Sequence, residues 1–487
     1  MSLKVKNIVY ISFLFIIDVL IVASIYMKVY FPDNSIDELL FNLVFESTDS
    51  DFTPLFAAIK VIYPYIIVLF IIFLVIFYSK SFFGIKKSDR LLKITHNRKT
   101  SSIFLLIVTF IVFIFSFDVI KFIYYKSVSS DFISDNYVSP KKENITFNEK
   151  RNLIYIVLES FESTLLTLDN GGSFSYSIIP EVDKLINEDD VITFKSDSGK
   201  VGSRVIEGSS FTSASLIANS TGLPFKYSIF HTYNEENFLS GIYNLGDLLY
   251  DNGYHNELIS AATTNFGGLN YYYQNHGKYD IIDISRYSKY GLSFKDSDKG
   301  PWGFNDNYMY ESAKKRLEVL SKEDKPFNLT MIGIDTHFPD GFSGEYTLNM
   351  FDDSYSNAYA TESYLLYDFI NWVREQEFYK DTTIVIMGDH LSMEKRFFKD
   401  INKDDRYVFV CYINAFNKPI NKENRIYTAL DTYPTILGAM GVDIKGNQLG
   451  LGVNMFSDKK TLVEEHGYSY VDKELQKKSN FYFETIK

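Results

Sequence analysis

The sequence predicts an α/β protein with an N-terminal membrane region of three helices, followed by a larger domain whose mostly parallel β-sheet is flanked by helices. Two observations predict this arrangement. Three apolar runs, each close to the length of a membrane-spanning helix, occur before residue 125. After residue 150, short apolar runs alternate with longer amphipathic stretches, a pattern typical of parallel strands covered on both faces.

The predicted membrane spans are residues 8–27, 61–79 and 103–123. Each run approaches the roughly 20 apolar residues that cross a bilayer as a helix. A buried core helix is the alternative for any one run, but three such runs favour a membrane region. The first run is long for a signal peptide and lacks a small-residue cleavage site, so we expect it to remain as an anchor. Asp18 and Asp118 lie inside these apolar runs and are expected to serve helix packing or to lie near the interface.

The basic residues between the spans predict the orientation of the chain. Between the second and third spans lie Lys80, Lys86, Lys87, Arg90, Lys93, Arg98 and Lys99. The loop between the first two spans has only Lys28 and Lys60 beside a larger number of acidic residues. Cytoplasmic loops are enriched in Lys and Arg. We therefore expect a multi-pass protein of the plasma (inner) membrane, with its large domain on the extracytoplasmic or periplasmic side.

The predicted membrane region comprises residues 1–126. The rest of the chain is predicted to contain a linker and one large domain. Residues 127–150 are polar and have no apolar period, which favours a linker, and the domain would then occupy residues 151–487. Predicted strands are Leu153–Leu158, Phe327–Ile334, Ile384–Met387 and Tyr407–Tyr412, and predicted helices include 308–321 and 358–378. Ligands of such sheets bind at the carboxyl ends of the strands, so polar residues that follow the apolar runs are candidate site residues.

Composition argues against one class of partner and excludes two kinds of cysteine site. The net charge of −12 argues against nucleic acid as a partner, because phosphate backbones require basic patches. The single cysteine, Cys411, excludes an intramolecular disulfide and a four-cysteine zinc site.

Three side chains that can bind a metal follow two predicted strands. Glu159 comes directly after LIYIVL, and Asp389 and His390 follow IVIM after one glycine. Carboxylates with one imidazole suit a divalent cation such as manganese, zinc or magnesium. For each residue alone, a solvated loop or a turn is an equally good interpretation.

Thr212 is the candidate nucleophile. It opens a predicted helix within GSSFTSASLIANSTGLPF, residues 208–225. A helix start offers free amides and a favourable dipole to an alkoxide and to phosphoryl oxygens. Since Ser and Thr are also common helix N-caps, a capping role is the alternative for this residue.

The motifs in order resemble the lipid-dependent phosphoglycerol transferase branch of the alkaline-phosphatase and sulfatase superfamily. They are LES (158–160), a threonine ten residues before GLP, FGGLNYYYQNHG (266–277), WGFNDNYMYESAKKRL (302–317), DTHFPDGF (335–342), GDHLSM (388–393), DTYPTILGAMG (431–441) and LGLGVNMFS (449–457). The resemblance covers about residues 150–460. Within this branch it is strongest to the enzymes that modify membrane-derived oligosaccharides, and the lipoteichoic acid synthases are more distant.

The resemblance implies an alkaline-phosphatase-like fold and a role for each matching residue. Thr212 would be the covalent nucleophile and a ligand of one divalent metal ion, held also by Glu159, Asp389 and His390. His337 would contact the phosphoryl group or protonate the leaving oxygen; a turn histidine before Pro339 is its alternative. Phe266, Gly267, Trp302 and Asp306 are expected to line the substrate cleft, although packing roles are equally compatible with the sequence.

The implied activity is transfer of a phosphoglycerol group from an anionic phospholipid, phosphatidylglycerol being expected, to an extracytoplasmic glycan through a phospho-threonine-type intermediate. Alternatives are a phosphoethanolamine transferase, a phosphodiester hydrolase and a non-catalytic membrane receptor. Phosphoethanolamine transferases usually carry several paired cysteines, which this chain lacks. The segment NFGGLN lacks the arginine of the lipoteichoic acid synthases, which disfavours glycerol phosphate polymerisation. SFTSAS lacks the proline and arginine of a formylglycine motif, which disfavours sulfatase activity.

Overall fold

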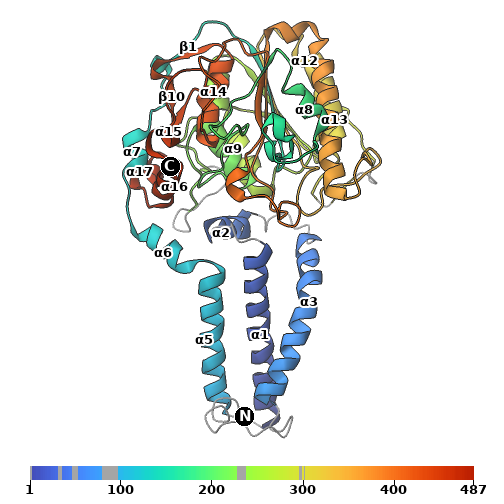
Figure 1. Cartoon of the computed structure of the whole chain (residues 1–487), viewed down its shortest axis with the longest axis vertical. Helices are drawn as coiled ribbons and strands as arrows, with labels where there is room; N and C mark the ends of the chain where they lie inside the picture. Colours follow the sequence, from blue (N-terminus) through green and yellow to red (C-terminus); the bar gives the residue numbers. More distant parts are fainter. Residues whose placement is uncertain are drawn as a thin grey trace. The chain divides into compact units, whose positions relative to one another are not determined.

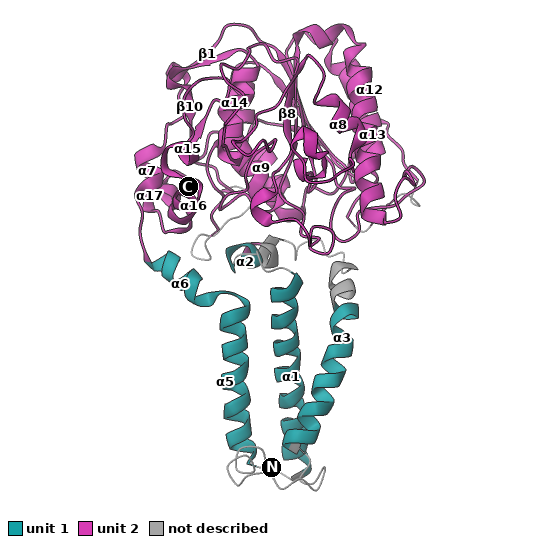
Figure 2. Cartoon of the chain, viewed as in Figure 1, with its two compact units in different colours: residues 1–40, 50–127 teal, residues 41–49, 128–487 magenta. Residues whose placement is uncertain are grey.

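The computed structural model describes residues 3–30, 36–45, 53–78, 97–227, 237–295, 299–300 and 302–486. The chain divides into two compact units (Figure 2). Unit 1 comprises residues 1–40 and 50–127, and unit 2 comprises residues 41–49 and 128–487.

Unit 1 contains the apolar helices. They are α1 (Leu3–Tyr30), the first half of α2 (Ile36–Phe45), α3 (Thr53–Phe73) with a π-helical extension (Leu74–Tyr78), α5 (Arg98–Ser116) and α6 (Val119–Ser127). Among the residues that the structure describes, three helical stretches are long and apolar enough to cross a membrane: Lys4–Tyr30, Ile59–Phe77 and Arg98–Ser116. Leu14 and Ile17 of α1 pack with Phe73 of α3 and Leu105 of α5, so the three helices share one apolar core.

The third helix differs from the predicted span 103–123. It begins at Arg98, where the Asn97 side chain accepts a hydrogen bond from the Lys99 amide, and it ends at Ser116. Asp118 has a φ of 48°, a left-handed conformation that does not continue an α-helix. Its carboxylate lies 2.9 Å from the Lys28 ammonium, so the polar residue ends the helix instead of lying within it. The basic residues from Lys80 to Lys93 lie outside the described residues.

Unit 2 is built on a seven-stranded sheet with the order β3-β8-β7-β2-β6-β4-β5. The strands are β2 (Asn152–Leu158), β3 (Val191–Ile192), β4 (His255–Ser260), β5 (Asp280–Ile282), β6 (Phe327–Ile332), β7 (Thr382–Gly388) and β8 (Val410–Ile413). All pairs are parallel except those made by β8, which runs antiparallel to β7 and β3. The predicted α/β class with a mostly parallel sheet is confirmed.

Helices cover both faces of this sheet (Figure 1). They are α8 (Pro180–Leu185), α9 (Thr212–Thr221), α10 (Leu245–Asp251), α11 (Leu269–Asn275), α12 (Asp306–Leu320), α13 (Ser354–Arg374) and α14 (Thr432–Ala439). Apolar residues of α8, α12 and α13 pack on Ile154, Ile156 and Leu158 of β2, while α9 and α14 lie on the other side. β2 is therefore buried on both faces, which explains its continuous apolar sequence.

Short elements complete unit 2 around the edges of the sheet. They are α7 (Phe132–Asn136), α15 (Leu462–His466), α16 (Tyr468–Gln476), α17 (Asn480–Thr485), β1 (Ile145–Phe147), β9 (Val442–Ile444), β10 (Gln448–Leu449) and β11 (Gly452–Val453). β1 pairs antiparallel with β9. Most of the polar segment 127–150 therefore has structure of its own and belongs to unit 2.

Candidate active site

The central strands bring the predicted site residues to one edge of the sheet. Glu159 directly follows β2, Asp389 and His390 directly follow β7, and His337 lies in the loop after β6. β7, β2 and β6 are neighbours and run parallel, with Val157 opposite Met387 on one side and Ile332 on the other. Their carboxyl ends therefore meet at the same place.

Glu159, Asp389 and His390 form a compact buried cluster. One potential ligand atom from each residue lies within 4.8 Å of the others. The His390 Nε2 is 3.5 Å from Glu159 Oε1 and 3.4 Å from Asp389 Oδ2. These distances are compatible with three ligands around a single ion, because each atom can reach one shared centre.

Thr212 lies next to this cluster. It is the first residue of α9, and its hydroxyl lies 3.3 Å from Glu159 Oε2 and 3.5 Å from His390 Nε2. Phe211 occupies the cap position and the Thr212 side chain makes no capping hydrogen bond, so the capping alternative is wrong. Unlike the three buried residues, Thr212 is partly exposed and can meet a substrate.

The hydrogen bonds of the cluster suit a divalent cation. Asp389 Oδ1 accepts the amides of Ser160 and His390, while Asp389 Oδ2 is buried without a hydrogen-bond partner in the described part of the chain. His390 Nδ1 lies 2.9 Å from the Leu391 carbonyl, which places the ring proton there and leaves the Nε2 lone pair facing the cluster. Burial, reinforced by the Glu159 carboxylate, raises the pKa of Asp389 to about 6. A bound cation would counteract this effect.

Two hydroxyl groups that the sequence did not single out tie the site loops together. The Thr336 hydroxyl donates to the Glu159 carbonyl, and the Ser215 hydroxyl of α9 donates to the Asp389 carbonyl. In the sequence, the only indication of this role is their position: Thr336 directly precedes His337, and Ser215 follows Thr212 by three residues. These bonds fix the loop of His337 and the helix of Thr212 to the ends of β2 and β7.

His337 is held in one tautomer by its own loop. Its Nδ1 lies 2.5 Å from the Phe338 carbonyl, so Nδ1 carries the proton and Nε2 has the free lone pair when the ring is neutral. Burial lowers the pKa of His337 to about 4. The neutral imidazole is therefore the form at pH 7, and its Nε2 lone pair can accept a hydrogen bond from a substrate hydroxyl.

Aromatic side chains stand beside His337. The ring centroids of Trp302 and His337 are 4.2 Å apart, and Phe266 meets Trp302 edge to face at 6.5 Å. Gly267 lies against the start of α9, because a Cβ added to it would be 2.2 Å from the Ser213 hydroxyl. The structure thus places Trp302 against His337, Phe266 against Trp302, and Gly267 against Ser213, the residue after Thr212.

Asp306 has a different position from the one expected for a cleft residue. It is 1% exposed, and its carboxylate accepts the amides of Ile334 and Asp335, the start of the loop that carries His337. Asp306, Asp335 and Glu362 form a second buried cluster with oxygens within 4.8 Å of one another. In this position Asp306 supports the loop from beneath.

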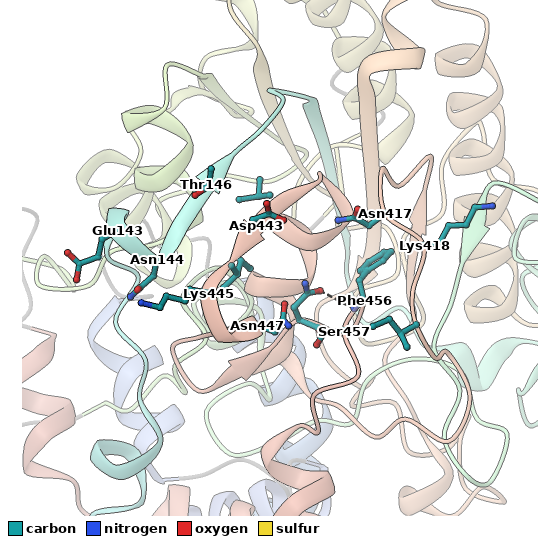
Figure 3. A pocket seen from close by; sticks show the side chains of 14 residues that line it. Glu143, Asn144, Thr146, Asn417, Lys418, Asp443, Lys445, Asn447, Phe456 and Ser457 are labelled. Carbon is teal, nitrogen blue, oxygen red and sulfur yellow. Dashed lines mark hydrogen bonds between the residues drawn. The ribbon is translucent and has the colours of Figure 1, made fainter.

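An open pocket lies elsewhere in unit 2. It has a volume of about 640 Å³ and is lined by residues from 143–146, 417–420, 442–447 and 454–457 (Figure 3). Its lining includes the β1–β9 ladder, which lies near the amino end of β2, at the opposite edge of the sheet. None of the candidate catalytic residues lines this pocket, so we place the chemistry at the strand ends.

Comparison with known proteins identifies the type of domain. A family model described as Sulfatase matches residues 151–442. A phosphoglycerol transferase I of Salmonella choleraesuis (strain SC-B67) is 29% identical over 320 residues, which are 64% of this chain but only 39% of that relative.

Two solved structures share the fold. The lipoteichoic acid synthase LtaP of Listeria monocytogenes is 19% identical with a TM-score of 0.51, covering 68% of this chain and 82% of that one. The integral membrane lipooligosaccharide phosphoethanolamine transferase A (EptA) of Neisseria meningitidis is 14% identical with a TM-score of 0.50, covering 90% of this chain and 87% of that one. The latter similarity extends over the apolar N-terminal helices.

Proposed function

This chain belongs to the sulfatase family, and on that premise we propose that it is a membrane-anchored transferase that moves a phosphoglycerol group from an anionic phospholipid to an extracytoplasmic glycan. The observation that supports it most directly is the position of Thr212. A partly exposed hydroxyl at a helix start lies within 3.5 Å of a carboxylate and an imidazole that end two central strands.

In the proposed first step, the Thr212 oxygen attacks the phosphorus of the lipid phosphodiester. A bond forms between Oγ1 and phosphorus, and the bond between phosphorus and the diacylglycerol oxygen breaks. The threonine proton ends on the departing diacylglycerol. The amides at the start of α9 face the phosphoryl oxygens and stabilise their charge.

In the second step, a hydroxyl of the acceptor glycan attacks the phosphorus and the bond to Thr212 breaks. His337 Nε2 takes the proton of the attacking hydroxyl, because its Nδ1 is already committed to the Phe338 carbonyl. The proton then passes to the Thr212 oxygen, which restores the enzyme. Phe266 and Trp302 would provide an apolar wall for the substrates beside His337.

Glu159, Asp389, His390 and Thr212 would hold one divalent cation. Such an ion supplies Lewis-acid polarisation of the phosphoryl oxygen and lowers the pKa of the Thr212 hydroxyl. The three apolar helices of unit 1 would anchor the enzyme in the membrane that contains its lipid donor.

The test uses the purified full chain in vesicles of labelled phosphatidylglycerol, with phosphatidylethanolamine vesicles in parallel. Without acceptor, the enzyme should release diacylglycerol up to one equivalent and then slow, with phosphoglycerol attached to Thr212 in a peptide digest. Thr212→Ala should abolish release. Thr221→Ala, at the far end of the same helix, should not, because that hydroxyl bonds the Ile217 carbonyl and the Leu223 amide and none of the site residues.

Two results would contradict the proposal. Release of diacylglycerol from phosphatidylethanolamine but not from phosphatidylglycerol would show that the donor is not phosphatidylglycerol. Diacylglycerol release by Thr212→Ala at nearly the wild-type rate would show that water or another residue attacks.

A further inference from the structure

One buried residue, Ser160, contacts two of the four residues proposed to hold the cation. Its amide donates to Asp389 Oδ1 at 2.7 Å, and its hydroxyl donates to Glu159 Oε1 at 2.7 Å. Ser160 is 1% exposed and has a φ of 49°, a conformation that non-glycine residues rarely adopt. Such a conformation persists where the surroundings impose it, which points to a function for this residue.

These two bonds determine which oxygens remain available. Asp389 Oδ1 accepts two amides, and Oδ2 has no hydrogen-bond partner in the described residues. Glu159 Oε1 accepts the Ser160 hydroxyl, and Oε2 is the oxygen that faces Thr212. Ser160 therefore holds one oxygen of each carboxylate, and this leaves Asp389 Oδ2 facing His390 Nε2 at 3.4 Å and Glu159 Oε2 facing the Thr212 hydroxyl at 3.3 Å, while Glu159 Oε1 itself lies 3.5 Å from His390 Nε2.

Ser160 is itself held from beneath by tyrosines of α13. The Tyr359 hydroxyl donates to the Ser160 carbonyl at 2.8 Å. One helical turn away, Tyr355 donates to the Thr336 carbonyl at 3.1 Å and lies 2.6 Å from the Ser392 hydroxyl. With Ser392 donating to Tyr355, the hydroxyl protons of Tyr359, Tyr355 and Ser392 each have one acceptor: the Ser160 carbonyl, the Thr336 carbonyl and the Tyr355 oxygen. The pair thus joins the loops that follow β2, β6 and β7.

We propose that Ser160 is a positioning residue that orients Glu159 and Asp389 toward the cation, and that Tyr359 keeps Ser160 in the required conformation. The inference rests on the proposed cation site. Residues that orient metal ligands typically contribute about 10- to 100-fold to metal affinity. The prediction therefore concerns the dissociation constant of the metal, which a purely structural role would leave unchanged.

The experiment titrates the purified, chelator-treated full chain with Mn²⁺ by calorimetry. Ser160→Ala and Ser160→Gly should both bind Mn²⁺ at least about tenfold more weakly than wild type. Gly relieves the positive φ but lacks the hydroxyl, so it separates backbone strain from ligand orientation. Tyr359→Phe should weaken binding by about fivefold, the effect of one hydrogen bond near 1 kcal/mol.

Two matched controls lie away from the site. Ser312→Ala removes a buried hydroxyl that bonds the Tyr308 carbonyl on α12. Tyr367→Phe removes a hydroxyl of α13 that donates to Glu188. Both should bind Mn²⁺ as wild type does. At saturating Mn²⁺, turnover should recover in Ser160→Ala but not in Thr212→Ala.

Wild-type affinity in both Ser160 variants, or weaker binding equally in the controls, would overturn the positioning role while leaving the cation site intact. No divalent cation bound by the wild-type protein would overturn the cation site, and this inference with it. A lowered melting temperature of Ser160→Ala without a change in Mn²⁺ affinity would assign Ser160 to the fold alone.

Discussion

Replacing Glu362 by Gln should make the stability of this protein less sensitive to pH. Glu362, Asp306 and Asp335 are buried together with no basic side chain among their hydrogen-bond partners in the described residues. Burial raises the pKa of Asp306 from 3.8 to about 6, and burial together with the Asp306 charge raises the pKa values of Asp335 and Glu362 well above their usual range. The folded protein therefore binds protons here more tightly than the unfolded chain.

The sign and size of the effect follow from this difference. A carboxyl whose pKa is raised by folding gives its full stabilisation below pH 3.8, and this is lost as the pH rises through about 6. For Asp306 alone the loss amounts to about 3 kcal/mol, at about 1.4 kcal/mol per pKa unit. Gln keeps the oxygen that accepts from the Tyr310 hydroxyl and removes one titrating group. We expect the loss of stability between pH 4 and pH 8 to shrink by at least about 1 kcal/mol.

The assay is thermal unfolding of the full chain in detergent across this pH range, followed by tryptophan fluorescence. For a large domain, 1 kcal/mol corresponds to a change of about 2 °C in melting temperature. Glu311→Gln is the control, because that residue forms an exposed ion pair with Lys314 on the surface of α12. Identical profiles of melting temperature against pH for wild type and Glu362→Gln would refute the conclusion that the buried carboxyl groups of this cluster bind protons more tightly in the folded protein.

Two further predictions concern the site and the membrane. Gly267→Ala should lower turnover by about tenfold or more, because the added Cβ would displace Ser213 next to the proposed nucleophile. Gly199→Ala is the control, because Gly199 also has a positive φ but has open space around it. Unchanged turnover in Gly199→Ala would show that the steric clash with Ser213, and not backbone strain, causes the loss. A cysteine introduced between residues 127 and 150 should react with an impermeant thiol reagent in intact cells, and labelling only from the cytoplasmic side would contradict the proposed orientation.

The sequence predicted the parts of the fold whose physics is local. β2 and β7 are buried on both faces, and their uninterrupted apolar runs were visible as LIYIVL and IVIM. β4 was not predicted, because His255–Ser260 contains Asn256 and Glu257. Those residues are buried only because Asn256 bonds the Gly246 and Gly277 carbonyls and Glu257 pairs with Arg316 at 2.7 Å, partners that no local pattern reveals.

The site was predictable to the same extent. Polar residues directly after central strands, such as Glu159 and Asp389, could be selected because parallel strands end at one edge. The supporting residues could not, since Tyr355 and Tyr359 look like ordinary core residues of an amphipathic helix until the tertiary structure places their hydroxyls under the loops. Asp306 was expected in the cleft because of the motif resemblance, which does not show that its carboxylate accepts the amides of Ile334 and Asp335.

The order of strands in the sheet also determines when the protein can become active during its synthesis. Ser160 and Asp389 are 229 residues apart along the chain, and β2 has its two neighbours only in β6 and β7. Contacts between residues so far apart in the sequence form slowly, because much of the chain must lose conformational entropy before these contacts stabilise the fold. The nucleophile helix α9 is made early, yet its threonine has no histidine or aspartate beside it until β7 has emerged and inserted. Under the proposed mechanism, a partially synthesised chain up to that point would lack the assembled site and could not act on the lipid donor.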